Sequence, residues 1–190
     1  MPRFSLRALI VCLVLAFSGT LAFAEEAPLP KDSLYQLETR WLDQEGNRAR
    51  LQQFRGHPVL ITMAYTRCKY SCPMIVEKLK KIEKELAFLP ELKILLVSFD
   101  HKNETPNTFR AFLKEKGLDS QRWKMLAGEN ASAVRELAAV LEVNFKAEKN
   151  GDFSHSNVIA LLDSDGRKRA SLNGLAADIK SLVSAAQEKK

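Results

Sequence analysis

Two cysteines, Cys68 and Cys72, are separated by three residues in the segment "YTRCKYSCPM". Thiolates at this spacing can either close a disulfide or bind a soft metal ion. Two cysteines are too few for a disulfide scaffold, and a domain of this size does not need one. The remaining cysteine, Cys12, lies in an apolar N-terminal segment. The pair therefore indicates a chemical role rather than structural support.

A histidine late in the chain can supply a third donor. His155 lies in "GDFSHSNVIALL", two residues before an expected strand at 157–162. Two thiolates and one imidazole suit copper, because Cu(I) accepts three ligands and imidazole also serves Cu(II). Zinc accepts the same donors but usually takes a fourth. The alternative for His155 is an ordinary loop histidine at the surface. His57 precedes the first buried strand and should lie too far from the cysteines.

Alternating strands and helices must position these residues. Apolar runs predict buried strands at 58–66 and 92–100 and a short strand at 122–128, while helical spacing and end signals predict helices at 73–89, 105–117 and 130–143. This order predicts an α/β fold with a parallel pair of strands in the centre and helices on both faces. Reactive groups gather at the carboxyl edge of such strands. The cysteines follow the first strand there, and the helix N-terminus should favour the thiolate of Cys72.

Hairpins are expected at both ends of this unit. One turns at 45–47, the other turns at 164–166, and a last helix follows at 175–187. The apolar stripe of the helix after the cysteines should consist of Met74, Ile75, Leu79, Ile82, Leu86 and Leu89.

The N-terminus has the order of a secretory signal: basic residues, an apolar stretch and small residues that end at Ala24. We expect a signal peptide over 1–24, a flexible lead-in over 25–32 and one domain over 33–190. The protein should then be periplasmic. The alternative is anchoring to the inner membrane by an uncleaved N-terminal segment, although 8–17 is short for a span.

The charge balance excludes one class of partner. Removing the two arginines of the signal lowers the formal net charge from +6 to +4. No arginine-rich stripe is interleaved with aromatic residues, so no nucleic-acid partner is expected.

Three segments in order resemble the Sco family of thioredoxin-like, copper-binding proteins that help to assemble cytochrome c oxidase. They are "YTRCKYSCP", "VSFDHKNETPNTFRAFLKEKGLDSQRWKMLAG" and "FSHSNVIALLDSDGR". The resemblance implies a three-layer thioredoxin-like sandwich with a central mixed sheet and an N-terminal β-hairpin. It assigns Cys68, Cys72 and His155 to the ligand positions for one copper ion, Cu(I) or Cu(II). It places Asp100 at the family's acidic position near the site.

Two residues depart from the family pattern. Lys69 and His101 stand where family members usually carry prolines. Lys69 and Arg67 make the rim of the site cationic, which could offset the charge of a Cu(I) dithiolate or weaken capture of a cation. His101 could be an alternative ligand, or simply a surface residue in a turn. Tyr65, Tyr70 and Phe153 could shield the site from water.

Two functions remain open. The first is a metallochaperone that delivers copper to, or matures, the copper centre of cytochrome c oxidase or a related cuproenzyme. The second is a thiol-disulfide oxidoreductase that reduces the cysteines of such a target through Cys68 and Cys72, with a thioredoxin-like reductant as a further partner. No proline follows Pro106, and His155 stands roughly where redox enzymes of this fold carry a cis-proline, which favours metal binding. A peroxidase motif is missing, because Ile61 and Tyr65 occupy its proline and hydroxyl positions.

Overall fold

The apolar run before the cysteines forms the centre of the sheet. In the computed structural model, which describes residues 27–68 and 71–188, all six residues of β3 (Val59–Ala64) are buried. β3 runs parallel to β4 (Lys93–Ser98), and β4 runs parallel to β5 (Trp123–Gly128). The expected parallel pair is thus a set of three, because the strand predicted at 122–128 forms as β5 and pairs parallel with β4.

Antiparallel strands flank this parallel centre. β1 (Trp41–Asp43) and β2 (Arg48–Ala49) form the expected hairpin, and β1 pairs with β5. On the other side β8 (Val158–Leu162) pairs with β3 and with β9 (Lys168–Asn173). The strand order is β2-β1-β5-β4-β3-β8-β9. The prediction of an α/β fold with a central mixed sheet and an N-terminal hairpin is therefore confirmed.

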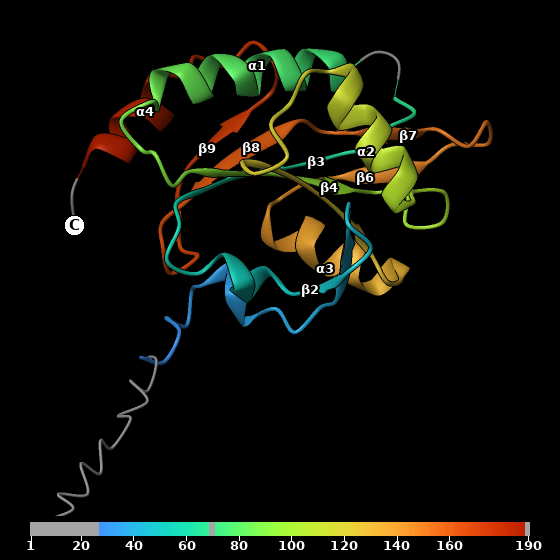
Figure 1. The fold of residues 1–190 in the computed structure, drawn as a ribbon, viewed down its shortest axis with the longest axis horizontal. Helices are drawn as coiled ribbons and strands as arrows, with labels where there is room; N and C mark the ends of the chain where they lie inside the picture. The colour runs from blue at the N-terminus through green and yellow to red at the C-terminus, as the bar shows by residue number, and fades with distance from the viewer. Residues whose placement is uncertain (1–26, 69–70, 189–190) are drawn as a thin grey trace, which may run out of the picture.

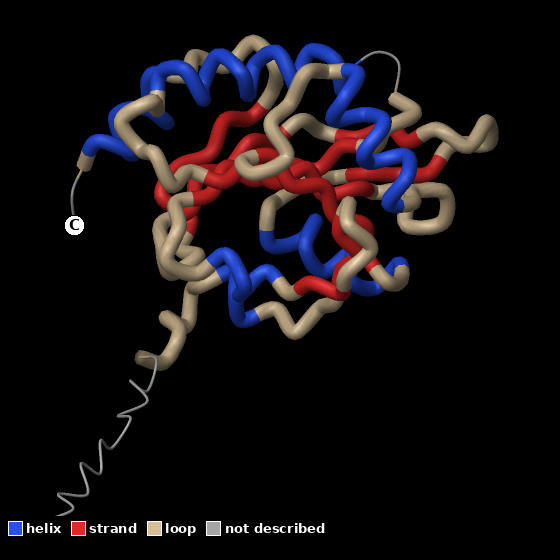
Figure 2. Tube along the Cα trace, in the orientation of Figure 1, coloured by secondary structure: helices blue, strands red, loops and turns tan. Residues whose placement is uncertain are grey.

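Helices cover both faces of the sheet, as Figures 1 and 2 show. One face carries α1 (Ser71–Glu85), α2 (Pro106–Glu115) and α4 (Lys180–Gln187). The other face carries α3 (Ala131–Val140) and the short 3-10 helices η1 (Leu34–Gln36) and η2 (Leu51–Phe54). The two faces bury separate hydrophobic clusters, which gives the three layers that were expected.

The predicted helix and its stripe differ from α1 at both ends, because α1 ends at Glu85 and the partly buried Leu89 lies beyond it. Ile75, Leu79, Ile82 and Leu86 are buried as expected. Met74 is 55% exposed, so its prediction as a core residue is wrong. The reason is rotational: Cys72, which is buried, begins the stripe, and a residue two places further along lies on the opposite side of a helix.

Local signals fix where the other helices begin. Thr105 caps α2, with Thr108 returning the bond in a capping box, and Asn130 caps α3. α4 begins at Lys180, five residues later than expected. The preceding connection is held by Lys78 of α1, whose ammonium donates to the carbonyls of Leu175 at 2.8 Å and Ala177 at 2.5 Å.

A second, two-stranded sheet was not anticipated. β6 (Phe145–Ala147) pairs antiparallel with β7 (Phe153–His155), and Phe145 lies opposite His155. The sequence indicated that His155 lies in a loop, but the structure shows that it is the last residue of a strand. The β6–β7 hairpin places it beside the carboxyl end of β3, a position that the functional site uses.

The predicted signal peptide, including Cys12, lies outside the described residues. Of the predicted lead-in, Leu29 packs against the core and Asp32 forms an ion pair with Arg167 at 3.0 Å. Among the described residues, none of the helices has the length and apolar character needed to span a membrane.

Candidate metal centre

The two cysteines lie on one continuous segment between β3 and α1. Cys68 is half-buried in the connection, and Cys72 is buried in the first turn of α1. The backbone N–H of Cys72 donates to the Sγ of Cys68 at 3.4 Å. The helix N-terminus thus acts on the sulfur of Cys68, whereas the sequence had placed its effect on Cys72. The difference arises because α1 begins at Ser71 and includes Cys72.

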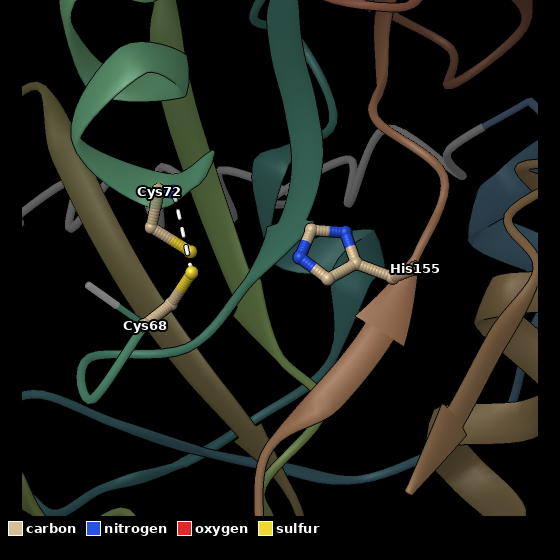
Figure 3. Close-up of side chains that lie close together, drawn as sticks. All are labelled: Cys68, Cys72 and His155. Atoms are coloured by element: carbon tan, nitrogen blue, oxygen red, sulfur yellow. Dashed lines mark hydrogen bonds between the residues drawn. The ribbon is translucent and has the colours of Figure 1, made fainter. Parts of the chain in front are cut away.

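His155 brings the third donor from β7. One ring nitrogen of His155 and the sulfurs of Cys68 and Cys72 all lie within 4.8 Å of one another. Figure 3 shows the imidazole turned toward the two sulfurs. The Nδ1 atom lies 3.1 Å from the carbonyl oxygen of Ser156. A proton on Nδ1 would be donated to that carbonyl, which leaves Nε2 as the donor to a metal.

This donor set fits a soft metal ion. Metal binding requires both cysteines in the reduced form. Three donor atoms this close together can hold one metal ion. Two thiolates and an imidazole are ligands that Cu(I) accepts in three coordination. The same two thiols can instead exchange electrons with a disulfide, so geometry alone permits both chemistries.

Tyr65 connects the two sides of the centre. It follows β3, is buried, and its hydroxyl accepts the N–H of Phe153 at 3.3 Å and donates to Asp152 Oδ1 at 3.4 Å. Burial raises the pKa of Tyr65 to about 12, and the negative charges of Cys68 and Asp152 act in the same direction against the phenolate. The phenol therefore stays protonated and able to donate at neutral pH.

Aromatic rings surround the imidazole. The ring centroid of Phe99 lies 4.9 Å from that of His155, and the centroid of Tyr65 lies 6.3 Å from it. The ring centroid of Phe99 also lies 5.0 Å from that of Phe145 and 6.1 Å from that of Phe153. We refer to Tyr65, Phe99, Phe145 and Phe153 as the aromatic cluster. These contacts restrict the rotation of the imidazole and exclude water from one side of it.

Asp100 pairs with Arg67, the residue directly before Cys68. Its carboxylate is buried, forms an ion pair with Arg67 and accepts from Asn103 Nδ2 at 2.7 Å. The charge of Arg67 is therefore already paired, so it is less available to offset the charge of a bound Cu(I). His101 is half-buried beside this pair, and it is not among the three residues whose donor atoms come together. Lys69 and Tyr70 lie outside the described residues.

Sequence reasoning missed Glu104, which organises the connection that carries Cys68. Glu104 is buried, and its carboxylate accepts the backbone N–H of Thr66 at 2.7 Å and its hydroxyl at 2.9 Å. The hydroxyls of Ser98 and Thr108 donate to the same carboxylate at 3.1 and 3.0 Å. The side chain thus ties the end of β3 to β4 and to the first turn of α2. Its place directly before a Thr-Pro helix start was the available signal.

His57 lies where the sequence placed it, away from the cysteines. It precedes β3, and its Nδ1 is 3.6 Å from a carboxylate oxygen of Glu91, just before β4. The cysteines follow the other end of β3, which is six residues long.

Comparison with known proteins identifies the family. The family model described as SCO1/SenC matches residues 31–188, so the chain belongs to the SCO1/SenC family. A curated relative from Danio rerio, named mitochondrial Protein SCO2 homolog, is 29% identical over 143 residues, or 73% of this chain. The match covers 51% of that protein, so the chain spans about half the length of this relative.

Solved structures share the fold. The copper-bound ScoI of Arabidopsis thaliana is 17% identical with a TM-score of 0.68, covering 78% of this chain and 96% of that one. BsSco, described as a member of the Sco family of cytochrome c oxidase assembly proteins with a disulfide switch, is 23% identical with a TM-score of 0.67. The match to BsSco covers 86% of this chain and 100% of that one. These similarities confirm the expected thioredoxin-like fold.

Proposed function

We propose that this protein is a periplasmic copper-binding metallochaperone that delivers copper to, or matures, the copper centre of cytochrome c oxidase or a related cuproenzyme. The observation that carries the proposal is the convergence of Cys68, Cys72 and His155 within 4.8 Å. Membership of the SCO1/SenC family and the copper bound by the Arabidopsis relative support copper as the ion. Export rests on the N-terminal sequence pattern.

The chemistry of the three donors suits a carrier. Two thiolates hold Cu(I) tightly, and a three-coordinate ion remains open to a further ligand from an acceptor. Both cysteines must be reduced for binding, so disulfide formation and metal loading exclude one another. Cell fractionation with and without residues 1–24 tests the location: a periplasmic, shortened form of the protein is expected.

A metal titration tests the proposal directly. Reduced protein should bind one equivalent of Cu(I) in competition with a chelator, and Cys68→Ser or Cys72→Ser should abolish tight binding. His155→Ala should mainly weaken the Cu(II) form. Met74→Ala, an exposed sulfur-bearing position outside the donor set, is the matched control and should bind as the unsubstituted protein does. Equal affinity in the cysteine variants would refute copper binding at this site.

A thiol-disulfide oxidoreductase is the second candidate, favoured by one contact. The N–H of Cys72 donates to Sγ of Cys68, which stabilises a thiolate on the more exposed of the two cysteines. That thiolate could attack a target disulfide, and Cys72 would then displace the target thiol and leave a Cys68–Cys72 disulfide. The disulfide switch described for BsSco supports such chemistry. Reduction of an oxidised apo-cuproenzyme, followed by its free-thiol count, tests it.

A further inference from the structure

A groove of about 530 Å³ lies beside the candidate metal centre. We refer to it as the basic groove. Its floor is apolar and consists of Phe99, Val134, Phe145 and Phe153. Phe99 and Val134 are buried, whereas Phe145 and Phe153 are half-buried and present part of their rings to the groove. The volume falls within the range of roughly 300–1,000 Å³ that is usual for sites that enclose a ligand.

The floor is continuous with the surroundings of the metal ligand. Three of its four residues belong to the aromatic cluster, and the Phe99 ring lies 4.9 Å from the His155 ring. An occupant of the basic groove would therefore contact rings that in turn contact the imidazole. The groove and the metal centre are neighbouring parts of one surface.

The rim carries unbalanced positive charge. Four Lys or Arg side chains and a single acidic one, Asp100, line the groove. Asp100 is paired with Arg67, one of the four. Lys102, Arg135 and Lys146 are exposed, and no described residue forms an ion pair with any of them. Three cations around an aromatic floor are complementary to an acidic segment with an apolar side chain at its centre.

We propose that the basic groove docks an acidic peptide segment of the copper-exchange partner, with one aromatic or large aliphatic side chain inserted against Phe99 and Phe145. The inference rests on the proposed function for the identity of the partner. The apolar anchor supplies binding energy, and the acidic residues steer the partner toward the metal centre. A concave surface of this size favours a side chain over a flat anionic membrane.

Binding of a defined probe tests the groove without metal. The probe is acetyl-Asp-Glu-Phe-Glu-Asp-amide, added to the reduced, metal-free protein and followed by ¹⁵N–¹H NMR. We expect shifts in the backbone signals of Phe99, Phe145 and their neighbours. Affinity should fall steeply as the ionic strength rises from about 0.01 M to about 1 M, because the Debye length shortens from about 30 Å to about 3 Å. The analogue with Ala in place of Phe, and the neutral Asn/Gln analogue, should both bind more weakly.

Paired charge reversals provide the matched comparison. The double variant Arg135→Glu and Lys146→Glu removes rim cations, and its affinity for the probe should fall by at least about tenfold. Lys81→Glu with Lys84→Glu makes the same change of net charge on exposed residues of α1, outside the groove, and should leave the affinity unchanged. Equal weakening in both variants, or shifts confined to other surfaces, would overturn the proposal. The proposal would also be overturned if binding to anionic vesicles depended on Arg135 and Lys146 and binding of the peptide did not.

Copper measurements separate this proposal from the proposed function. The Arg135 and Lys146 variant should bind Cu(I) normally but transfer it more slowly to an acceptor, whereas Cys68→Ser should lose Cu(I) but keep the probe. Normal transfer by the rim variant would overturn the groove and leave copper binding intact. A protein that binds the probe but no copper would refute the metallochaperone and leave the peptide site intact.

Discussion

The hydroxyl of Tyr65 accepts the backbone N–H of Phe153 at 3.3 Å, and this bond joins two segments that are 88 residues apart in the sequence. Tyr65 follows the strand that leads to the cysteines, and Phe153 begins the strand that ends at His155. A single phenol thus links the sulfur side of the site to the imidazole side.

Replacing Tyr65 by Phe tests this link. Tyr65→Phe keeps the ring but removes the hydroxyl, so the free energy of unfolding should fall by about 1 kcal/mol and the Cu(II) affinity should fall as His155 becomes less well placed. Urea unfolding and chelator competition measure the two effects. Tyr35→Phe is the control: it removes a buried hydroxyl that bonds to the carbonyl of Phe54 and should destabilise without changing the copper affinity. Unchanged copper affinity in Tyr65→Phe would argue against the link.

The same phenol predicts a dependence of stability on alkaline pH. The pKa of Tyr65 is raised to about 12, so between about pH 10 and 12 the folded protein keeps a proton that the unfolded chain loses. The contribution of Tyr65 to the free energy of unfolding is therefore fully present below pH 10. It declines as the pH rises through 12, by roughly 2–3 kcal/mol in total. Tyr35, whose pKa is also raised by burial, contributes in the same direction. Urea unfolding across this range should show a shallower decline for Tyr65→Phe than for the unsubstituted protein.

Glu104 should be essential for the connection that carries Cys68. Glu104→Gln preserves its size, but one of the two accepting oxygens becomes an amide nitrogen, which cannot accept the two hydrogen bonds that this oxygen receives. We expect a loss of about 1–3 kcal/mol in the free energy of unfolding, with faster hydrogen exchange at Thr66. Glu136→Gln, an exposed glutamate on α3 that bonds to Ser132, should change stability by less than about 0.5 kcal/mol. Similar effects in both variants would show that the buried bonds do not stabilise the site.

Arg67 and Asp100 should be coupled energetically. Arg67→Met leaves the buried carboxylate of Asp100 with Asn103 as its only side-chain partner among the described residues, which should destabilise the fold by about 1 kcal/mol, a modest value because Arg67 is half exposed. Adding Asp100→Asn removes the unpaired charge. The double variant should therefore be more stable than Arg67→Met alone, and urea unfolding of the four proteins measures this coupling. Strict additivity would contradict the pairing.

Much of the fold could be predicted because its strongest signals are local. The buried runs of β3 and β4 and the helical spacing of α1 are long, and the caps at Thr105 and Asn130 are explicit in the sequence. The hairpin before β9 turns at Gly166. Its positive φ of 79° favours glycine, and the Tyr35 ring leaves no room for a side chain at this position.

The remaining features depend on tertiary contacts that no local pattern reveals. β6 and β7 are three-residue strands separated by polar residues, so their pairing gives no periodic signal. Glu104 lies in the polar segment "DHKNETP" and resembles a surface residue, although three elements meet around it. The donor residues themselves were found from their chemistry and from the resemblance to the Sco family. Their proximity follows only from the β6–β7 hairpin, because 82 residues separate Cys72 from His155.

The division of the ligands between two sheets has a consequence for how copper would leave. Both sulfurs belong to the main body, on the segment that joins β3 to α1, whereas the nitrogen belongs to the small β6–β7 hairpin. A bound ion would reversibly cross-link the main body to the β6–β7 hairpin. Breaking the single bond to nitrogen would free one coordination position while both sulfurs still hold the cargo. In the proposed function, an incoming ligand would then bind before the first sulfur dissociates, and the ion would pass to the acceptor in stages without release into solution.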